Sequence, residues 1–205
     1  MKRGHWQILL AAALFLLALG LTLYPVVSNW YIGRHQSRIQ TEYREVLEQT
    51  DSAEIESIRE SAVAYNKTIT PGAAEEAYSQ ASIRLAAEDY VNQLNVSGSG
   101  IMGYVEIPKI GVDLPIYHGT GADSLDRGTG HLLGSSLPVG GESTHTIITG
   151  HSGMASQKMF TDLEQLREGD IFYLHVLDET LTYEVREIHT VLPHDTTYLG
   201  IEPGE

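Results

Sequence analysis

From residue 101 onward the chain consists of short runs rich in β-branched and aromatic residues, separated by turns that contain glycine or proline. This pattern predicts strands at residues 102–107, 112–117, 144–149, 171–176 and 181–186, with a hairpin turn at 177–180 and an extension of the last strand at 188–192. Short helices are expected only near residues 124–127 and 158–166. Many short strands with such turns indicate a mainly β fold, a barrel or a sandwich, rather than an α/β sheet.

The N-terminal segment has a different character. Lys2 and Arg3 precede a span of about 20 mostly apolar residues, and Arg34 is the next charged residue. We predict a transmembrane anchor at residues 6–28, a cytoplasmic N-terminus at 1–5 and an extracellular location for the rest. A cleaved signal peptide is the competing interpretation. The anchor is favoured because the apolar run is longer than a signal core and no A-x-A cleavage site follows it.

Residues 29–96 are predicted to be helical. Apolar residues recur at helical spacing in two groups, which predicts one or two amphipathic helices leading away from the membrane: Ile39, Tyr43, Val46 and Leu47, then Ile55, Ile58, Ala62 and Tyr65. A break at residues 70–72 precedes a further helix expected at 73–94, and a Ser-Gly-Ser-Gly linker follows at 97–100. We therefore expect a helical stalk and lid region at 29–96 and a β-rich domain at 97–205.

The composition excludes several classes of protein. The chain of 205 residues has 27 acidic and 13 basic residues, so it lacks the clustered cations that nucleic-acid binding requires. It contains no cysteine, and therefore no disulfide, thiolate metal site or cysteine nucleophile. A metal-dependent hydrolase would need a carboxylate and histidine cluster, which the sequence does not offer. We expect no metal and no cofactor.

A series of motifs runs through the β-rich part of the chain: residues 107–110 (Ile-Pro-Lys-Ile), 114–119 (Leu-Pro-Ile-Tyr-His-Gly), 130–132 (Gly-His-Leu), 135–145 (Ser-Ser-Leu-Pro-Val-Gly-Gly-Glu-Ser-Thr-His), 149–151 (Thr-Gly-His), 160–163 (Phe-Thr-Asp-Leu) and 169–170 (Gly-Asp). This series resembles the sortase family, and the long stretch at 135–145 together with the anchor resembles its pilus-building subgroup, class C. The resemblance implies an eight-stranded barrel on the outer face of a Gram-positive membrane. It also implies cleavage of an LPXTG-type sorting signal on a pilin or surface protein, followed by transfer of the acyl group to a lysine of the next pilin.

In this family a thiolate attacks the threonine carbonyl, an imidazole protonates the leaving amine and deprotonates the incoming one, and a guanidinium steadies the developing oxyanion. The motif assigns the general acid/base role to His151. We interpret His118, His131 and His145 as structural, because no metal-ligand spacing such as H-x-x-x-H joins them. Ser152 is a poor substitute nucleophile, since neighbouring side chains on an extended strand point to opposite faces.

The sequence departs from the family pattern at two places. The cysteine and arginine strands expected after residues 201–205 are absent, so the resemblance implies that the last two barrel strands are missing, that the chain is truncated or a fragment, and that it is inactive as given. The Asp-Pro-aromatic lid motif is also absent between residues 66 and 95. Tyr78 and Tyr90 are expected to pack on their own helix rather than to plug the site.

A rival hypothesis is a non-catalytic, membrane-tethered β-module that binds pilin or another surface protein. The missing nucleophile supports this alternative, but a non-catalytic module would have no use for the motif around His151.

Overall fold

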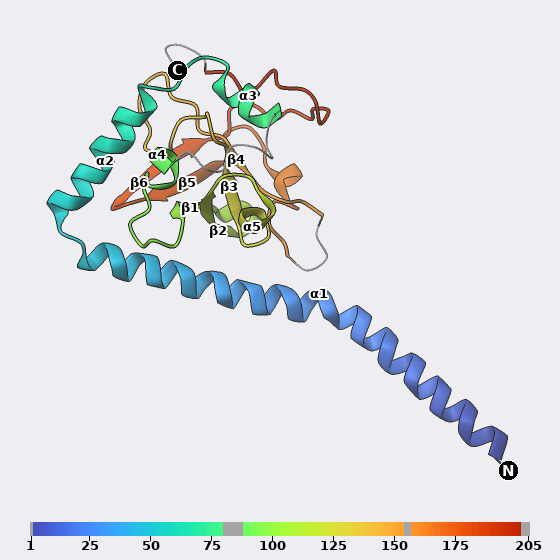
Figure 1. Ribbon diagram of the computed structural model, residues 1–205. Coiled ribbons are helices and arrows are strands. Elements are labelled where there is room, and N and C mark those ends of the chain that lie inside the picture. Colours follow the sequence, from blue (N-terminus) through green and yellow to red (C-terminus); the bar gives the residue numbers. More distant parts are fainter. Residues whose placement is uncertain (1, 80–87, 154–156, 202–205) are drawn as a thin grey trace.

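Six strands form one mixed sheet at the centre of the protein (Figure 1). The computed structural model describes residues 2–79, 88–153 and 157–201. The strands lie in the order β4-β3-β2-β1-β5-β6, and their bounds are β1 Ile101–Ile107, β2 Val112–His118, β3 Thr129–His131, β4 Ile148–Thr149, β5 Ile171–Val176 and β6 Glu179–Glu184. Only the β2–β3 pair is parallel. The β-rich domain expected from the sequence is present as this mixed sheet, whose outer strands are β4 and β6.

A tight connection joins β1 to β2. The 3-10 turn η1 (Pro108–Ile110) begins with proline, whose fixed φ suits a first helical position, and ends at Gly111 with a φ of 61°. This turn returns the chain at once, so that Ile107 pairs with Val112. Both strands are almost wholly buried, which explains why their sequences are apolar runs rather than alternating patterns.

The first helix, α1 (Lys2–Gln49), runs without a break through Pro25. Its His5–Ser28 segment, 24 residues with a mean hydropathy of 2.3, is long and apolar enough to cross a membrane. Figure 1 shows this half projecting away from the sheet, whereas the later half runs beside it. There Tyr43 is buried against Ile101, Tyr104 and Tyr117 of β1 and β2.

Helix α2 (Ser52–Asn66) starts after a capping residue, because the Asp51 side chain accepts a hydrogen bond from the Ala53 N–H at 2.8 Å. The break predicted at 70–72 is present. The helix expected at 73–94 is represented by α3 (Ala73–Ser79) and α4 (Glu88–Val91), and residues 80–87 of that prediction lie outside the described residues.

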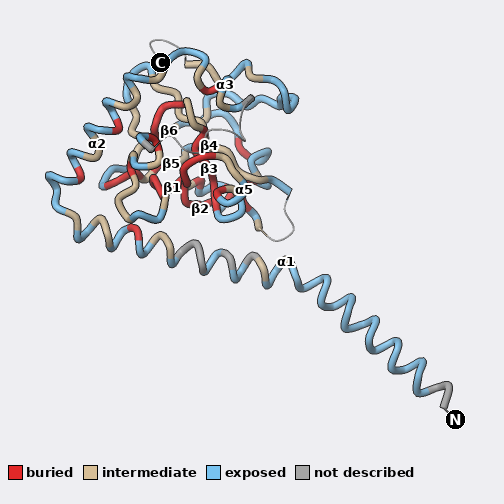
Figure 2. The backbone as a smooth tube through the Cα atoms, in the orientation of Figure 1, coloured by how far each residue is buried: buried red, intermediate tan, exposed pale blue. Residues whose placement is uncertain are grey.

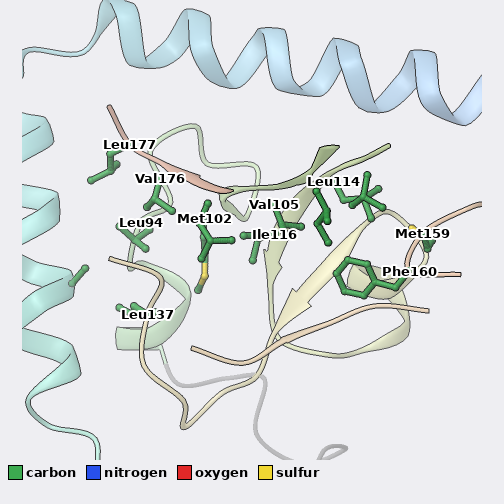
Figure 3. Close-up of a cluster of buried hydrophobic side chains, with 14 of the residues drawn as sticks. Leu94, Met102, Val105, Leu114, Ile116, Leu137, Met159, Phe160, Val176 and Leu177 are labelled. Carbon is green, nitrogen blue, oxygen red and sulfur yellow. The ribbon is translucent and has the colours of Figure 1, made fainter. Parts of the chain in front are cut away.

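The hydrophobic core lies between the sheet and the α2–α4 region. Figure 2 shows buried residues concentrated in the strands. Figure 3 shows the side chains of this core, with Met159 and Phe160 at one end and Leu94 and Leu177 at the other. Leu94, Met102, Ile116 and Leu137 are fully buried. The core therefore reaches from the α4 segment to the loop that follows β4.

Three local predictions were wrong. Residues 144–147 are not a strand. The Ile147 carbonyl accepts from the Leu132 N–H and the His145 carbonyl accepts from the Ser136 N–H, but these bonds join two loop segments and do not continue the β3–β4 strand pairing. Residues 188–192 form no strand either, and their large apolar side chains are exposed. The predicted four-residue turn at 177–180 is tighter: Val176 pairs with Glu179, and Leu177 has a φ of 54°.

The short helices are close to their predicted places. Helix α5 (Ala122–Leu125) lies two residues earlier than expected, and the segment predicted at 158–166 contains only the 3-10 turn η2 (Leu163–Gln165).

Candidate active site

His151 lies two residues after the end of strand β4, as the last residue of the Thr-Gly-His motif. Strand β4 pairs antiparallel with β3, so that Thr149 lies opposite Gly130. The His151 backbone carbonyl accepts a hydrogen bond from the Phe160 N–H at 3.0 Å, which joins His151 to the segment before η2. The His151 side chain is 41% exposed. A partly exposed imidazole on a fixed backbone is suited to proton transfer with a bound substrate.

Gly150 permits this arrangement because the Phe160 ring lies directly against its Cα. A Cβ added at Gly150 would stand 2.7 Å from Phe160 Cδ2, closer than real Cβ contacts. Phe160 is itself buried at the end of the hydrophobic core (Figure 3). The central glycine of the motif therefore lets the chain pass close to Phe160 at the edge of the core, while the next residue, His151, keeps its ring partly exposed.

Asp126 is a neighbour of His151 that the sequence analysis missed. It follows α5 as its C-cap, and its Oδ1 lies 3.9 Å from His151 Nε2. The Asp126 carbonyl accepts a hydrogen bond from the Gln157 side chain at 2.9 Å. No motif links residues 126 and 151, which are separated by 25 positions, so only the folded chain brings them together.

An apolar groove of about 420 Å³ lies between the β4 side of the sheet and strands β5 and β6. Phe160 lines this groove, and its backbone N–H donates to the His151 carbonyl, so His151 is joined to a residue of the groove wall. Its lining residues are Val105, Ile107, Thr144, His145, Thr146, Ile148, Phe160, Leu163, Leu166, Phe172, Leu174, Tyr183 and Val185. A groove of this kind suits an extended segment with apolar side chains.

The other histidines of the resemblance have structural contacts, as expected. His131 is fully buried, its Nε2 lies 2.8 Å from the Ser136 carbonyl oxygen, and its Nδ1 lies 2.9 Å from the Tyr90 hydroxyl. Burial lowers the pKa of His131 to about 4, so the ring is neutral near pH 7. The two ring nitrogens of His118 face the Gly100 and Gln93 carbonyls at 2.9 and 2.7 Å.

His145 is half-buried, with its Nδ1 2.7 Å from the Gly200 carbonyl oxygen. Among the described residues, no group of three or more His, Asp or Glu side chains could hold a metal ion.

The two tyrosines considered for the lid also have structural contacts. Tyr90 is fully buried, and its hydroxyl lies within hydrogen-bonding distance of His131 and accepts from the Gly119 N–H at 3.0 Å. The Tyr78 hydroxyl donates to the Pro193 carbonyl at 2.8 Å, which joins α3 to the segment after β6. Neither contact is with His151. Both hydroxyl contacts are made with segments outside the tyrosine's own helix, and Tyr78 is exposed, so the packing on their own helix expected from the sequence is not what these contacts show.

Comparison with known proteins identifies a family. Residues 105–205 match the family described as the sortase domain. Sortase D of Bacillus subtilis is 33% identical over 100 residues, which are 49% of this chain and 48% of that protein. The chain thus spans about half the length of that relative.

Two solved structures are similar over most of the chain. Sortase C of Streptococcus pneumoniae, an enzyme studied for its pilin substrate specificity, is 42% identical with a TM-score of 0.71, over 82% of this chain and 83% of that one. Sortase C-1 of Actinomyces oris is 39% identical with a TM-score of 0.66, over 74% of this chain and 84% of that one.

Proposed function

This chain belongs to the sortase family, and on that premise we propose that it is the anchor and barrel of a class C, pilus-assembly sortase in which His151 is the general acid/base. The observation that carries the proposal is the position of His151, partly exposed at the end of β4 and next to a groove wall. The two sortase C neighbours support the subgroup, as does the 135–145 stretch.

The proposed reaction is acyl transfer from a sorting signal to an amine. His151 would protonate the leaving amine when the threonine–glycine bond breaks, and it would later remove a proton from the incoming amine. The nucleophile of this chemistry is a cysteine thiolate, assisted by an arginine near the oxyanion. Because the 205 residues contain no cysteine, we propose that the chain as given does not carry out transpeptidation.

The proposed substrate is a pilin or surface protein that carries an LPXTG-like signal. The signal is an extended, largely apolar peptide, and the 420 Å³ groove offers apolar walls on the side of the sheet that includes β4. We propose that residues 6–28 span the membrane, that 1–5 lie in the cytoplasm, and that the helical region 29–96 and the barrel 97–205 lie outside.

A fusion protein tests the catalytic part. The full chain would be extended with the cysteine and arginine strands of the Streptococcus pneumoniae sortase C neighbour and reconstituted in nanodiscs. Cleavage of a fluorescent LPXTG peptide is expected in the fusion and absent in the unextended chain. His151→Ala should abolish it, whereas the matched control His189→Ala, on the segment after β6, should retain it.

Two results would contradict the proposal: a folded fusion that binds the peptide without cleaving it, or one that cleaves equally well without His151. The first would favour the alternative function, a membrane-tethered module that binds extended segments of surface proteins without catalysis. The observation that favours this alternative is the apolar groove, which could hold such a segment in the absence of any chemistry.

A further inference from the structure

The Asp126 carboxylate is exposed and faces the candidate general base. Its side chain is 65% exposed, and its contact in the described part of the chain is the 3.9 Å approach of Oδ1 to His151 Nε2. This distance is too long for a direct hydrogen bond. The Asp126 carboxylate and the His151 imidazole are therefore close to each other but not hydrogen-bonded to each other.

Arg127 and Lys158, which follow Asp126 and Gln157 in the sequence, make their contacts elsewhere. The guanidinium of Arg127, the next residue, lies 4.1 Å from the centre of the Tyr117 ring, and its Nε donates to the Asp123 carbonyl at 2.8 Å. The Lys158 ammonium donates to the Ile110 carbonyl at 2.7 Å and pairs with Asp162 at 2.8 Å. The negative charge of Asp126 is thus left without a cationic side chain among these neighbours.

The backbones that carry the pair are held in place. The Asp126 N–H donates to the Ala122 carbonyl at 2.8 Å, and the Asp126 carbonyl accepts from the Gln157 side-chain amide at 2.9 Å. The oxygen of this amide, Gln157 Oε1, is buried without a hydrogen-bond partner in the described structure. It is a spare acceptor on the residue that fixes Asp126.

We propose that Asp126 is the residue that receives the ammonium group of the incoming amine and places it against His151. This inference rests on the proposed acyl transfer. An ammonium has three donor hydrogens and no acceptor, whereas a carboxylate and a neutral imidazole nitrogen can each accept one of them. The bound R–NH₃⁺ gives one proton to His151 Nε2, which leaves R–NH₂ as the nucleophile and an imidazolium beside the carboxylate. Asp126 holds the amine before this transfer and stabilises the imidazolium after it.

The charge of the domain agrees with a cationic partner. Outside the first 32 residues, which contain Lys2 and Arg3, the chain has 27 acidic and 11 basic residues. Such an excess of acidic residues favours the approach of cations over that of anions. Asp126 supplies the specific contact within this general field, because it lies next to the group that must take the proton.

Binding of a lysine side chain tests the inference without any need for turnover. The full chain, labelled at histidine and held in nanodiscs, would be titrated with Nα-acetyl-lysine methylamide while the His151 ring signals are followed by NMR. Nα-acetyl-norleucine methylamide is the uncharged control ligand. Saturable shifts at His151 are expected with the lysine compound and not with the norleucine compound.

Three variants locate the effect. Asp126→Asn should weaken lysine binding about 10-fold or more, equivalent to about 1.4 kcal/mol. Asp126→Glu should retain the preference for lysine, because the charge remains. Asp123→Asn removes the same charge three residues earlier in α5, and it should change the affinity by less than about 2-fold, since an exposed charge that does not face the ligand contributes little.

The inference is overturned if lysine and norleucine compounds bind alike, if Asp126→Asn has no effect, or if Asp123→Asn has as large an effect. Titration of the same samples with an LPXTG peptide separates this result from the proposed function. Peptide binding without lysine binding would refute the role of Asp126 alone, whereas the loss of both would refute the proposed function as well.

Discussion

The rings of Tyr43 and Tyr104 lie edge to face, 5.5 Å apart, and both are buried, but their hydroxyl groups differ. The Tyr43 hydroxyl donates to the Met102 carbonyl and accepts from the Leu177 N–H, both at 3.2 Å. The Tyr104 hydroxyl is buried without a partner in the described part of the chain. Tyr43 thus joins helix α1 to strand β1 and to the β5–β6 turn.

Tyr43→Phe is expected to lower the free energy of unfolding by about 1–3 kcal/mol, because it leaves the buried Leu177 N–H and Met102 carbonyl without this partner. Tyr104→Phe is the matched control. It removes a buried hydroxyl that has no hydrogen bond, so it should be neutral or slightly stabilising. Urea unfolding followed by tyrosine circular dichroism measures both. Equal losses in the two variants would show that the Tyr43 bridge contributes nothing.

Acid should destabilise the protein through His131. The folded ring stays neutral to about pH 4, because burial lowers its pKa, whereas in the unfolded chain the pKa is about 6.5. Between these values the unfolded state binds more protons, so stability falls as the pH falls, by up to about 3 kcal/mol in all. Unfolding at a series of pH values measures the slope.

His131→Gln provides the comparison, since glutamine can still donate to the Ser136 carbonyl but does not titrate in this range. Its slope between pH 6.5 and 4 should be smaller than that of the wild-type chain, whatever its absolute stability. NMR titration of the His131 ring is an independent check. A ring that becomes protonated near pH 6.5 in the folded protein would contradict the prediction.

Gly134 marks the close approach of the β3–β4 loop to the start of α3. A Cβ at this position would lie 2.4 Å from the Ala73 carbonyl oxygen, and its φ is 88°. Gly134→Ala should therefore cost more than the strain of a positive φ alone. Gly72→Ala is matched to it, since Gly72 has a φ of 83° and no atom within 4 Å of the added Cβ.

The Gly72 variant should lose about 1 kcal/mol and the Gly134 variant at least about 1 kcal/mol more, because a backbone oxygen cannot move aside as a side chain can. Thermal unfolding of the two proteins under the same conditions measures the difference. Similar losses would mean that the loop shifts away from α3 at little cost.

The strands that could be predicted are those in which local pattern and burial agree. Strands β1, β2 and β5 were placed within a residue of their bounds, since each is a continuous apolar run that ends at a turn residue. Strand β3 was missed because its three residues, Thr129–His131, form a strand only by pairing with β2 and β4. The early start of β6 depends on Leu177 adopting a positive φ, which a branched residue seldom does.

The candidate site was predictable only in part, for a related reason. His151 was found because it lies within a short motif at a strand end. Asp126 could not be found, because its approach to His151 depends on how α5 packs against β3, the strand next to β4, and no spacing in the sequence encodes that. The segment 188–192 shows the converse, since its β-rich pattern has no strand partner among the described residues and remains irregular.

The contact between Gly150 and Phe160 gives the last prediction, since it supports His151. Gly150→Ala would place a Cβ 2.7 Å from Phe160 Cδ2, so the ring must move or the strand end must shift. We expect a loss of about 1–3 kcal/mol in unfolding free energy, together with displaced His151 ring signals in NMR spectra.

Adding Phe160→Leu to Gly150→Ala should recover part of both effects, because leucine lacks the ring edge that meets the new methyl group. The double variant would then be more stable than the sum of the single variants predicts, by about 0.5 kcal/mol or more. Phe160→Leu alone is the control, and it should leave the His151 signals closer to those of the wild-type chain than Gly150→Ala does. Strict additivity, with His151 unmoved in every variant, would show that Gly150 is not what positions His151.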